Sequence, residues 1–222
     1  MLDCSFVDLG LKTYREAYQI QLDAVKDVVE RKISTILFCE HPLTITIGRS
    51  GKAEHIRTPR SVLSKNGVMV CDIDRGGDVT LHAPGQLIVY PILDLRQWRQ
   101  DLHVYLRALE GVVIELLDQY GLVASRKAGY TGVWIRNRKI CSIGIGVRCW
   151  VTYHGLSLNV HIPLRYYSLI KPCGLDVSMT SIADQTKEVM DLGLIKQDII
   201  RLFKNTFNLR ILGKWEPQPV KV

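Results

Sequence analysis

Long apolar runs are missing from this 222-residue sequence, whose hydrophobic stretches are far shorter than the roughly 20 residues that a transmembrane helix needs. The first residues, "MLDCSFVDLGLK", also lack the basic region and apolar core of a secretory signal. We therefore expect a cytoplasmic protein without a membrane partner. Internal repeats, low-complexity linkers and breaks in composition are absent too. Their absence favours a single domain over 1–222, with 213–222 as a polar tail.

Close Cys-x-x-Cys pairs are absent as well, although the sequence contains six cysteines. Zinc sites usually take ligands from such pairs, so we expect no metal and no other cofactor. Disulfides are not expected either, because a reducing compartment keeps thiols reduced. Four of the cysteines lie in apolar, strand-like runs and are predicted to be small buried residues: Cys4, Cys39, Cys71 and Cys141.

The balance of charge is basic, with a formal net charge of +7 and an isoelectric point near 9.1. Such a charge favours an acidic partner, and an acidic carrier protein is one candidate. Nucleic acid is another, which leaves a non-catalytic nucleic-acid-binding protein as an alternative. The basic residues are scattered, however, and an aromatic-rich RNA-binding signature is missing, so we expect no nucleic acid partner.

Helical periodicity is present in three segments, 13–32, 101–121 and a stretch within 187–205. Thr13 and Glu16 have the spacing of a capping box, and Asp101 and Gly121 are the expected caps of the second helix. Strand patterns are present in 4–9, 34–40, 43–48, 68–95 with turns at 76–77 and 84–85, a hairpin over 132–147 about Asn137-Arg138, 151–160 and 209–212. This order predicts an α+β fold, a single domain with a mainly antiparallel or mixed sheet and flanking helices, and not a doubly wound parallel sheet.

Three stretches combine glycine with polar side chains and carry the candidate chemistry. The first, "RGGDVTLH", places Arg75, two glycines, Thr80 and His82 in one short loop and strand. The glycines let backbone N–H groups approach a ligand, and Arg75 neutralises an acidic one. Thr80 and His82 face the same side of a strand because they are two positions apart. A simple turn and a structural histidine are the alternatives.

The second stretch, "RKICSIGIG", has Lys139 at the start of a strand, just after the predicted hairpin turn. Ser142, Gly144 and Gly146 leave room above this strand, which favours a pocket wall over a solvated lysine. The third stretch, "YHGLS", adds small and polar residues of the same kind: His154, Gly155 and Ser157.

A further cysteine, Cys173, lies between Pro172 and Gly174 after an apolar run. Pro172 has a fixed φ and no N–H to donate, and Gly174 allows unusual backbone angles. These flanks suit a turn that presents a side chain. The context distinguishes Cys173 from the cysteines in strand-like runs.

With these segments the chain resembles the lipoyl(octanoyl) transferases, enzymes of lipoate assembly that transfer an octanoyl group between proteins. The matching segments, in the family's order, are "RGGDVTLHAPGQLIVYPI", "GVWIRNRKICSIGIGVRCWVTYHGLSLNV" and "IKPCGLDVSMTSI", and "TITIGRSG" resembles an early glycine–arginine segment. The fold that the resemblance implies is that of biotin and lipoate protein ligase catalytic domains. Two positions depart from the family pattern: Leu81, where tyrosine is common, and Ala83, where glycine is common.

The resemblance also implies roles for individual residues. Cys173 is then the nucleophile that becomes an acyl thioester, and Lys139 lowers the pKa of its thiol. Backbone N–H groups near Gly174 or Gly76-Gly77 are the expected oxyanion donors. The implied acyl-substrate site comprises Arg75, Gly76, Gly77, Asp78, Val79, Thr80, Leu81, His82, Ser142, Ile143, Gly144, Gly155, Leu156 and Ser157.

The implied partners are proteins that carry acyl groups. Octanoyl-acyl carrier protein is the donor, and the acceptors are lipoyl domains of 2-oxoacid dehydrogenase complexes and the glycine cleavage H protein. Two other activities stay open. An ATP-dependent lipoate or biotin ligase shares the implied fold but activates a free acid as an adenylate, so the Pro-Cys-Gly motif favours the transferase. A Cys–His acyl hydrolase would use His82 or His154 to activate the thiol.

Overall fold

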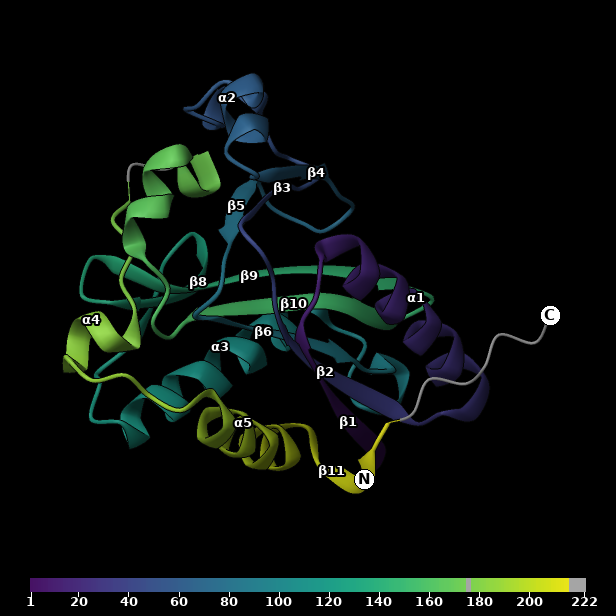
Figure 1. Cartoon of the computed structure of the whole chain (residues 1–222). Helices are drawn as coiled ribbons and strands as arrows, with labels where there is room; N and C mark the ends of the chain where they lie inside the picture. The colour runs from purple at the N-terminus through teal and green to yellow at the C-terminus, as the bar shows by residue number, and fades with distance from the viewer. Residues whose placement is uncertain (175–176, 216–222) are drawn as a thin grey trace.

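The computed structural model describes residues 1–174 and 177–215, with the side chain of Cys173 outside that description. Eight strands form the larger of two sheets, in the order β11-β1-β2-β6-β10-β9-β8-β7 (Figure 1). Their bounds are β1 Leu2–Leu11, β2 Ser34–Glu40, β6 Gln86–Ile92, β7 Ser125–Lys127, β8 Tyr130–Ile135, β9 Arg138–Arg148, β10 Val151–Asn159 and β11 Leu209–Lys214. β1 is parallel to β2 and β11, and the neighbours from β2 to β7 are antiparallel. The predicted α+β fold with a mixed, mainly antiparallel sheet is confirmed.

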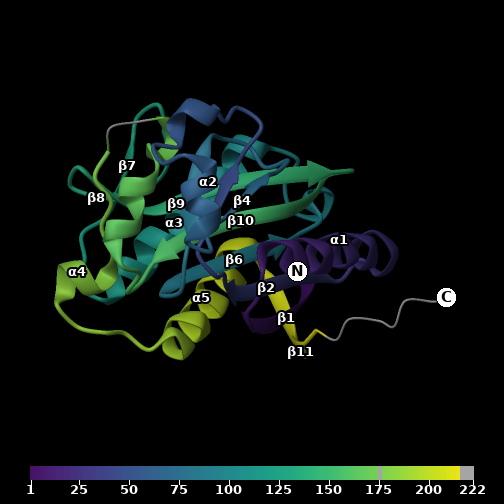
Figure 2. The same ribbon diagram turned by 45° about the horizontal axis from the view of Figure 1, so that its top comes forward.

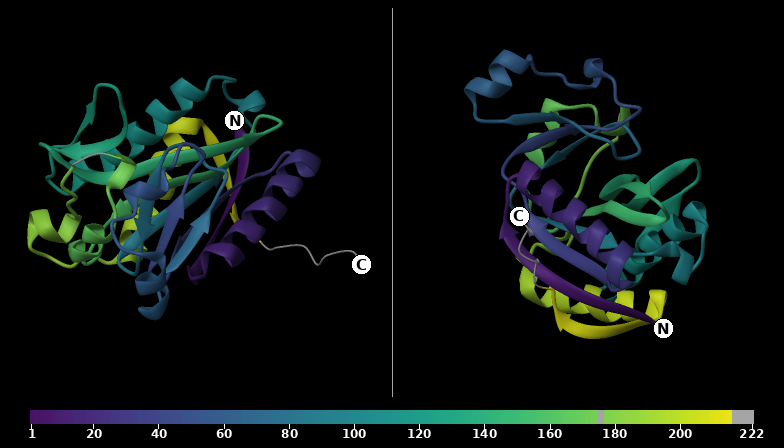
Figure 3. Two further views of the ribbon diagram at one scale, coloured as in Figure 1. Left: turned by 90° about the horizontal axis from the view of Figure 1, so that it is seen from above. Right: turned by 90° about the vertical axis from the view of Figure 1, so that its right-hand side faces the viewer.

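A smaller sheet of three strands, in the order β4-β3-β5, stands over one face of the larger sheet (Figures 2 and 3). It consists of β3 Thr44–Ile47, β4 Met69–Asp72 and β5 Val79–His82. The sequence predicted these strands but not that they form a sheet of their own. Alternation of apolar and polar residues identifies the two faces of a strand, and it does not identify the strand's partner.

Helices cover both faces of the larger sheet (Figure 1). α1 Tyr14–Arg31 lies on the same face as the small sheet and packs Ala24 and Val28 against residues of β2 and β6. α3 Leu102–Gln119 and α5 Leu192–Phe207 pack on the opposite face and contribute many of the buried residues of the main core. The small sheet has a separate core with α2 Arg60–Lys65 and the chain after β10.

The predicted helix caps are present. Glu16 N donates to Thr13 Oγ1 at 3.4 Å and Thr13 N donates to Glu16 Oε2 at 3.0 Å, which completes the capping box of α1. Asp101 accepts hydrogen bonds from two backbone N–H groups at the start of α3. Gly121 follows the C-cap of that helix, Tyr120, and adopts the left-handed φ of +70° expected of a terminating glycine.

Several short elements were not predicted, because they are too short to show a period. They are η1 Ala53–His55, α2, η2 Leu95–Gln97, η3 Leu164–Leu169, α4 Ile182–Thr186 and β7. The last long helix begins at Leu192, within the predicted stretch, where Asp191 accepts a hydrogen bond from Gly193 N, and it ends beyond that stretch, at Phe207. The hairpin turn between β8 and β9 falls at Arg136-Asn137, one residue before the predicted position.

The predicted polar tail starts later than residue 213. β11 continues to Lys214, and Trp215 is buried against α1, where its Nε1 donates to Asp27 Oδ2 at 3.3 Å. The remainder of that tail, 216–222, lies outside the described residues. Within the described ranges, none of the helices is long and apolar enough to cross a membrane.

Candidate functional site

The two sheets meet at the loop of residues 75–78, which precedes β5. Gly76 N donates a hydrogen bond of 2.8 Å to Ile145 O in β9 of the larger sheet. On the other side, the chain after β3 donates three hydrogen bonds to carbonyl oxygens of the loop: Gly48 N to Asp78 O, Arg49 N to Arg75 O and Ser50 N to Gly77 O, at 3.0 to 3.2 Å. The segments "TITIGRSG" and "RGGD" therefore form one unit.

Gly48 is required in this unit because no side chain fits there. A Cβ atom at Gly48 would collide with Gly77 O and would lie 2.7 Å from Arg75 Nη1. At Gly76, by contrast, a Cβ atom would meet Ile145 O at 3.5 Å, which is an ordinary contact. The loop therefore depends on the absence of a side chain at Gly48 and tolerates one at Gly76.

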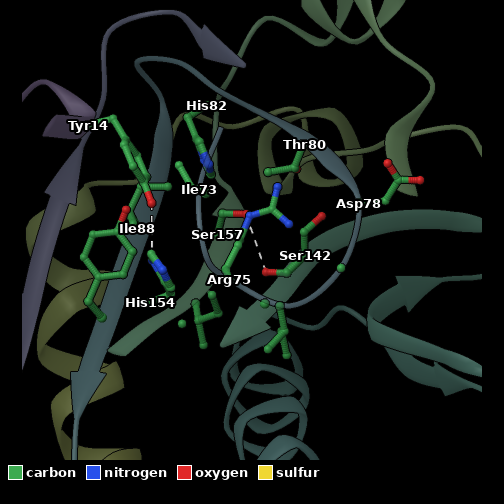
Figure 4. A pocket seen from close by; sticks show the side chains of 16 residues that line it. Tyr14, Ile73, Arg75, Asp78, Thr80, His82, Ile88, Ser142, His154 and Ser157 are labelled. Carbon is green, nitrogen blue, oxygen red and sulfur yellow. Dashed lines mark hydrogen bonds between the residues drawn. The ribbon is translucent and has the colours of Figure 1, made fainter. Parts of the chain in front are cut away.

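A cavity lies between this loop, β5 and the paired strands β9 and β10 (Figure 4). Eleven of the predicted substrate residues line it: Arg75, Gly77, Asp78, Thr80, His82, Ser142, Ile143, Gly144, Gly155, Leu156 and Ser157. The three polar, glycine-containing stretches of the sequence are thus brought together in space. The structure adds five further lining residues: Tyr14, Ile73, Ile88, Tyr90 and His154.

Three predicted substrate residues are not among the described residues that line the cavity. Gly76 lies in a second hollow next to it. Val79 and Leu81 alternate with the cavity residues along β5, so their side chains face the core of the small sheet and not the cavity. The departure from the family pattern at Leu81 therefore affects that core and not the cavity surface.

The Arg75 guanidinium lies in the cavity wall, and the residue is 8% exposed. Its Nη2 donates to Thr46 O at 2.9 Å and to Thr46 Oγ1 at 3.0 Å, and its Nη1 donates to Gly76 O at 3.1 Å. These bonds tie the loop to β3. Because arginine stays protonated in proteins, Arg75 gives the wall a fixed positive charge.

Hydrogen bonds fix His82 as a neutral imidazole. Gln86 Nε2 donates to three other groups, so Gln86 Oε1 accepts from His82 Nδ1 at 2.8 Å. His82 Nε2 then accepts from Thr46 Oγ1 at 3.3 Å. Burial, together with the neighbouring His41, lowers the pKa of His82 to about 3. His82 is therefore a weak base whose two ring nitrogens are both engaged.

His154 is held in a similar way at the other side of the cavity (Figure 4). Its Nε2 donates to Asp74 Oδ1 at 2.8 Å, and its Nδ1 accepts from Tyr14 OH at 3.3 Å. Burial lowers the pKa of His154 to about 4, although Asp74 acts in the opposite direction. Burial raises the pKa of Asp74, but hydrogen bonds from His154, Tyr153 and Tyr18 outweigh it and hold that pKa below its ordinary value. Both cavity histidines are thus unsuited to take a proton from a thiol, which argues against the Cys–His hydrolase.

Lys139 lies in the second hollow, which we call the lysine hollow. Its lining shares four residues with the cavity: Gly77, Asp78, Ile143 and Gly144. The two spaces therefore meet along the loop of residues 75–78 and strand β9. Lys139 is 2% exposed, so it belongs to the interior of the site and not to the solvated surface.

Two features hold Lys139 in place. Its side chain crosses Gly132, where a Cβ atom would lie 2.7 Å from Lys139 Cε, and its Nζ lies 5.0 Å from the centroid of the Trp134 ring. Its backbone N donates to Ser178 O and its carbonyl oxygen accepts from Thr180 N, each at 2.9 Å. The lysine is therefore tied to the segment that follows the predicted cysteine turn.

The predicted cysteine turn is the 3-10 turn η4 Pro172–Gly174. It follows a short pairing of two segments, in which Lys171 N donates to His55 O and Ile56 bridges Ile170. This pairing attaches the turn to the chain that leads away from β3. The prediction for the side chain of Cys173 lies outside the described residues.

The end of the turn packs against the rim of the cavity. A Cβ atom at Gly174 would lie 2.6 Å from His55 Cε1 and 2.8 Å from Asp78 Oδ2, and Gly174 has a φ of +67°. His55 Nδ1 and Asp78 Oδ2 are 2.6 Å apart, and both side chains are mostly buried. Asp78 is therefore bordered by the cysteine turn on one side and by the lysine hollow on the other.

Two of the expected oxyanion donors are already used within the fold. Gly76 N donates to Ile145 O, and Gly174 N donates to Lys171 O at 3.0 Å. These two N–H groups are therefore engaged in this conformation, and an oxyanion role for Gly77 N stays a prediction.

The other cysteines differ in burial. Burial raises the pKa of the Cys4 and Cys141 thiols to about 12 and raises that of Cys39 beyond its ordinary range. These three are buried as predicted, whereas Cys71 is only half-buried. Cys149, in the turn between β9 and β10, is exposed. In the part of the chain that the structure describes, no group of three or more His, Cys, Asp or Glu side chains is placed to hold a metal ion.

Four cavity residues were missed as site residues by the sequence analysis: Tyr14, Ile73, Ile88 and Tyr90. Tyr14 fits the apolar stripe of α1, and a stripe does not show which of its members reaches a cavity. Ile88 and Tyr90 are two positions apart on β6, so the sequence predicts that they share a face of the strand. It does not predict that this face borders the cavity. Nothing in the sequence indicates that His55 lies beside Gly174.

Comparison with known proteins gives consistent matches along the chain. Residues 13–204 match the family model of the lipoyl protein ligase A/B catalytic domain. An octanoyltransferase from Solibacter usitatus is 43% identical over 187 residues, which cover 82% of this chain and 84% of that protein. An octanoyltransferase from Thermoanaerobacter sp. is 38% identical over 203 residues, with 90% and 89% covered.

Solved structures share the fold at lower sequence identity. Lipoate-protein ligase A bound with ATP superimposes with a TM-score of 0.74 at 16% identity, over 97% of this chain and 90% of the ligase. A biotin protein ligase from Aquifex aeolicus gives a TM-score of 0.55 at 14% identity, over 92% of this chain and 70% of that protein. The predicted likeness to lipoate and biotin ligase catalytic domains is confirmed at the level of the fold.

The junction of the two sheets predicts unequal effects for the same substitution at two of its glycines, Gly48 and Gly76. Gly48→Ala should lower the free energy of unfolding by about 1–3 kcal/mol, because the new methyl group overpacks against the loop. Gly76→Ala, with an ordinary contact at the new methyl group, should stay within about 1 kcal/mol of the parent. Urea unfolding of both variants measures the difference, and equal loss in the two would contradict the junction described here.

The lowered pKa values of His82 and His154 predict how stability depends on pH. In the folded protein both stay neutral below their unfolded pKa of about 6.5, so the unfolded chain binds more protons as the pH falls. The free energy of unfolding should therefore decrease from about pH 6.5 towards about pH 4, by about 1.4 kcal/mol per pH unit for each such histidine. His82→Gln should reduce this slope in urea titrations, with His103→Gln, at an exposed position of α3, as the matched control. An undiminished slope in His82→Gln would contradict the assignment.

Proposed function

We propose a two-step acyl transfer for this chain, which belongs to the octanoyltransferase family and is an acyltransferase. The octanoyl group comes from octanoyl-acyl carrier protein, passes to Cys173 as a thioester, and ends as an amide on a lysine of a lipoyl domain. The observation that carries the proposal is the position of Asp78, which borders the cysteine turn, the cavity and the lysine hollow.

In the first step the Cys173 thiolate attacks the carbonyl carbon of the donor thioester. A carbon–sulfur bond to Cys173 forms, the carbon–sulfur bond to the carrier breaks, and the carrier thiolate leaves and takes up a proton from Lys139, which is then neutral. One thioester replaces another, so the step needs little driving force. A positive Lys139 favours the thiolate, because an opposite charge within reach lowers the pKa of a titrating group by roughly 1–3 units.

In the second step the amine of the acceptor lysine attacks the octanoyl-Cys173 carbonyl carbon. A carbon–nitrogen bond forms, the carbon–sulfur bond breaks, and the proton lost by the amine ends on the Cys173 thiol. Lys139 is the proposed carrier of that proton. The amide product is more stable than the thioester, and this difference drives the transfer forward.

The geometry around Lys139 supports this pairing. The lysine is buried in the hollow next to Asp78, and its backbone is bonded to Ser178 and Thr180, a few residues after the cysteine turn. The other end of the turn, at Gly174, approaches Asp78 as well. Two segments far apart in sequence are thereby fixed around one carboxylate.

The cavity supports an acyl substrate. Small residues of β9 and β10 form part of its wall, and Ile73, Ile88, Ile143 and Leu156 line it with apolar side chains. Each methylene buried there contributes roughly 0.8 kcal/mol. The cavity is thus a mainly apolar space that reaches the cysteine turn at Asp78. We propose that both sheets, which together line the cavity, act as one catalytic domain.

The proposed partners follow from charge and family. The net charge of +7 suits an acidic carrier as donor, because opposite charges raise the rate of association. The proposed acceptors are lipoyl domains of 2-oxoacid dehydrogenase complexes and the glycine cleavage H protein. The ATP-dependent ligase is the competing activity, since a lipoate ligase shares the fold, but the relatives at 38% and 43% identity are octanoyltransferases.

The proposal predicts a covalent intermediate that forms without nucleotide. Incubation with octanoyl-acyl carrier protein should increase the intact mass of the protein by one octanoyl group, and peptide mass analysis should locate it on Cys173. Cys173→Ser should lose the adduct, whereas Cys149→Ser, the same change at the exposed cysteine, should keep it. An adduct on Cys149, or one that requires ATP, would refute the mechanism.

The pairing of Cys173 with Lys139 predicts a shift in thiol reactivity. In a Cys149→Ser background, the alkylation rate of Cys173 is followed against pH. Lys139→Ala should move the midpoint upward by roughly 1–3 units, because the thiolate loses its positive neighbour. His82→Ala should move it less, because the weakly basic His82 is neutral in the folded protein. A midpoint that responds to His82→Ala and not to Lys139→Ala would make this a Cys–His enzyme.

A further inference from the structure

The cavity shares a wall with a neighbouring groove. The groove is lined by Tyr14, Arg15, Tyr18, Arg49, Val70, Cys71, Asp72, Ile73 and Asp74. Two residues belong to both linings, Tyr14 and Ile73. Their side chains therefore form the partition between the cavity and the groove.

This partition lies at the end of the cavity away from the cysteine turn. Asp78 borders Gly174 of the turn, and in Figure 4 Asp78 and Tyr14 lie on opposite sides of the cavity. An acyl chain whose carbonyl carbon is attached to Cys173 then runs from Asp78 towards Tyr14. Its methyl end is the part that reaches the partition.

We propose that the Tyr14 ring sets the length of the acyl chain that this enzyme transfers, by closing the far end of the cavity to chains longer than octanoyl. The proposal rests on the proposed function, because it requires the acyl group on Cys173. Ile73 completes the partition beside the tyrosine ring. Selection is then a matter of space, because an apolar wall cannot distinguish chains except by the room that it leaves.

Tyr14 is held firmly enough to act as a fixed wall. It is the first residue of α1, directly after the N-cap residue Thr13, and it is 3% exposed. Its ring packs against the rings of Tyr18 and His41, with centroids 6.2 and 5.6 Å away. Its hydroxyl donates to His154 Nδ1. A longer chain would have to displace the ring from all of these contacts.

The partner of Tyr14 is fixed in turn. His154 N donates to Gln21 Oε1 at 2.7 Å, and His154 Nε2 donates to Asp74 Oδ1 at 2.8 Å. His154 has a φ of +55°, a left-handed conformation that non-glycine residues rarely adopt. Contacts from α1 and from the chain before β5 thus hold the histidine against the tyrosine.

The test compares octanoyl, decanoyl and dodecanoyl carrier thioesters as donors, with kcat/KM measured for transfer to a lipoyl domain. The parent should prefer octanoyl over dodecanoyl by about tenfold or more, the effect of methylenes that a pocket cannot admit. Tyr14→Ala should reduce this preference by about tenfold or more, because the chain can then extend into the groove. Alanine at the start of a helix is well tolerated, so α1 should keep its structure.

Three further variants separate the ring from its surroundings. Tyr14→Phe keeps the ring and loses only the hydroxyl, so the chain-length preference should stay that of the parent. Ile73→Ala opens the partition at its other residue and should relax the preference in the same direction as Tyr14→Ala. Ile88→Ala enlarges the cavity at a residue that lines the cavity but not the groove, so it should relax the preference less.

The outcomes separate this proposal from the proposed function. If the parent transfers octanoyl through Cys173 and neither Tyr14→Ala nor Ile73→Ala alters the preference in folded protein, Tyr14 does not set the chain length. If Tyr14→Phe relaxes the preference as much as Tyr14→Ala, the hydrogen bond to His154 and not the ring is responsible, and the proposal also fails. If the parent forms no octanoyl-Cys173, the proposed function itself is wrong.

Discussion

The backbone pairing between the loop of residues 75–78 and the chain after β3 is the constraint on which the site depends. The loop donates to β9 of the larger sheet through Gly76 N, and it accepts from Gly48, Arg49 and Ser50 through its carbonyl groups. Backbone hydrogen bonds of this kind leave no room for side chains at the point of closest approach, and Gly48 supplies that room. The cavity and the lysine hollow lie on either side of this one loop, so a displacement of the loop would alter both.

Hydrogen bonds within the protein explain how polar residues can line a mainly apolar cavity. A buried polar group is destabilising unless its hydrogen bonds are made, and in this wall they are made within the protein. Arg75 is bonded to Thr46, His82 to Gln86 and Thr46, and His154 to Asp74. Because these groups are satisfied before a substrate arrives, an alkyl chain that enters does not leave them without partners. Rigid polar contacts therefore define the shape of the space that methylene groups fill in the proposed function.

The sequence predicted those parts of the fold that depend on local pattern. The capping box at Thr13, the N-cap at Asp101 and the shared face of Thr80 and His82 are local rules, and they are present in the structure. Pairing between distant segments is not local, and the sequence therefore did not show that β3, β4 and β5 leave the larger sheet. Short elements such as η1 were not predicted, because they contain too few residues to show a hydrophobic period.

The residues of the candidate site also divide into those that local sequence predicts and those that only the fold brings to the cavity. Residues that belong to glycine-containing polar stretches, such as Arg75 and Ser142, could be selected because their composition is unusual for a strand. Tyr14 could not, because it has the spacing of an ordinary core residue and only its place at the start of α1 brings it to the cavity. Val79 was included in the predicted site because it lies between site residues in the sequence. Its side chain faces the core of the small sheet, because successive side chains of a strand point to opposite faces. Composition thus identifies the segments of a site, and the three-dimensional fold decides which side chains face it.

The proposed thioester intermediate must survive long enough to meet its acceptor, and the basicity of the cavity histidines affects its rate of hydrolysis. Hydrolysis needs a base that can take a proton from water, and imidazole of ordinary pKa is the usual one. His82 and His154 are far weaker bases, with pKa values of about 3 and about 4, and their ring nitrogens are already bonded. A lysine acceptor does not need such strong assistance, because an amine is a better nucleophile than water. In the proposed mechanism the buried histidines therefore favour transfer over hydrolysis by shaping the cavity without offering a base to water.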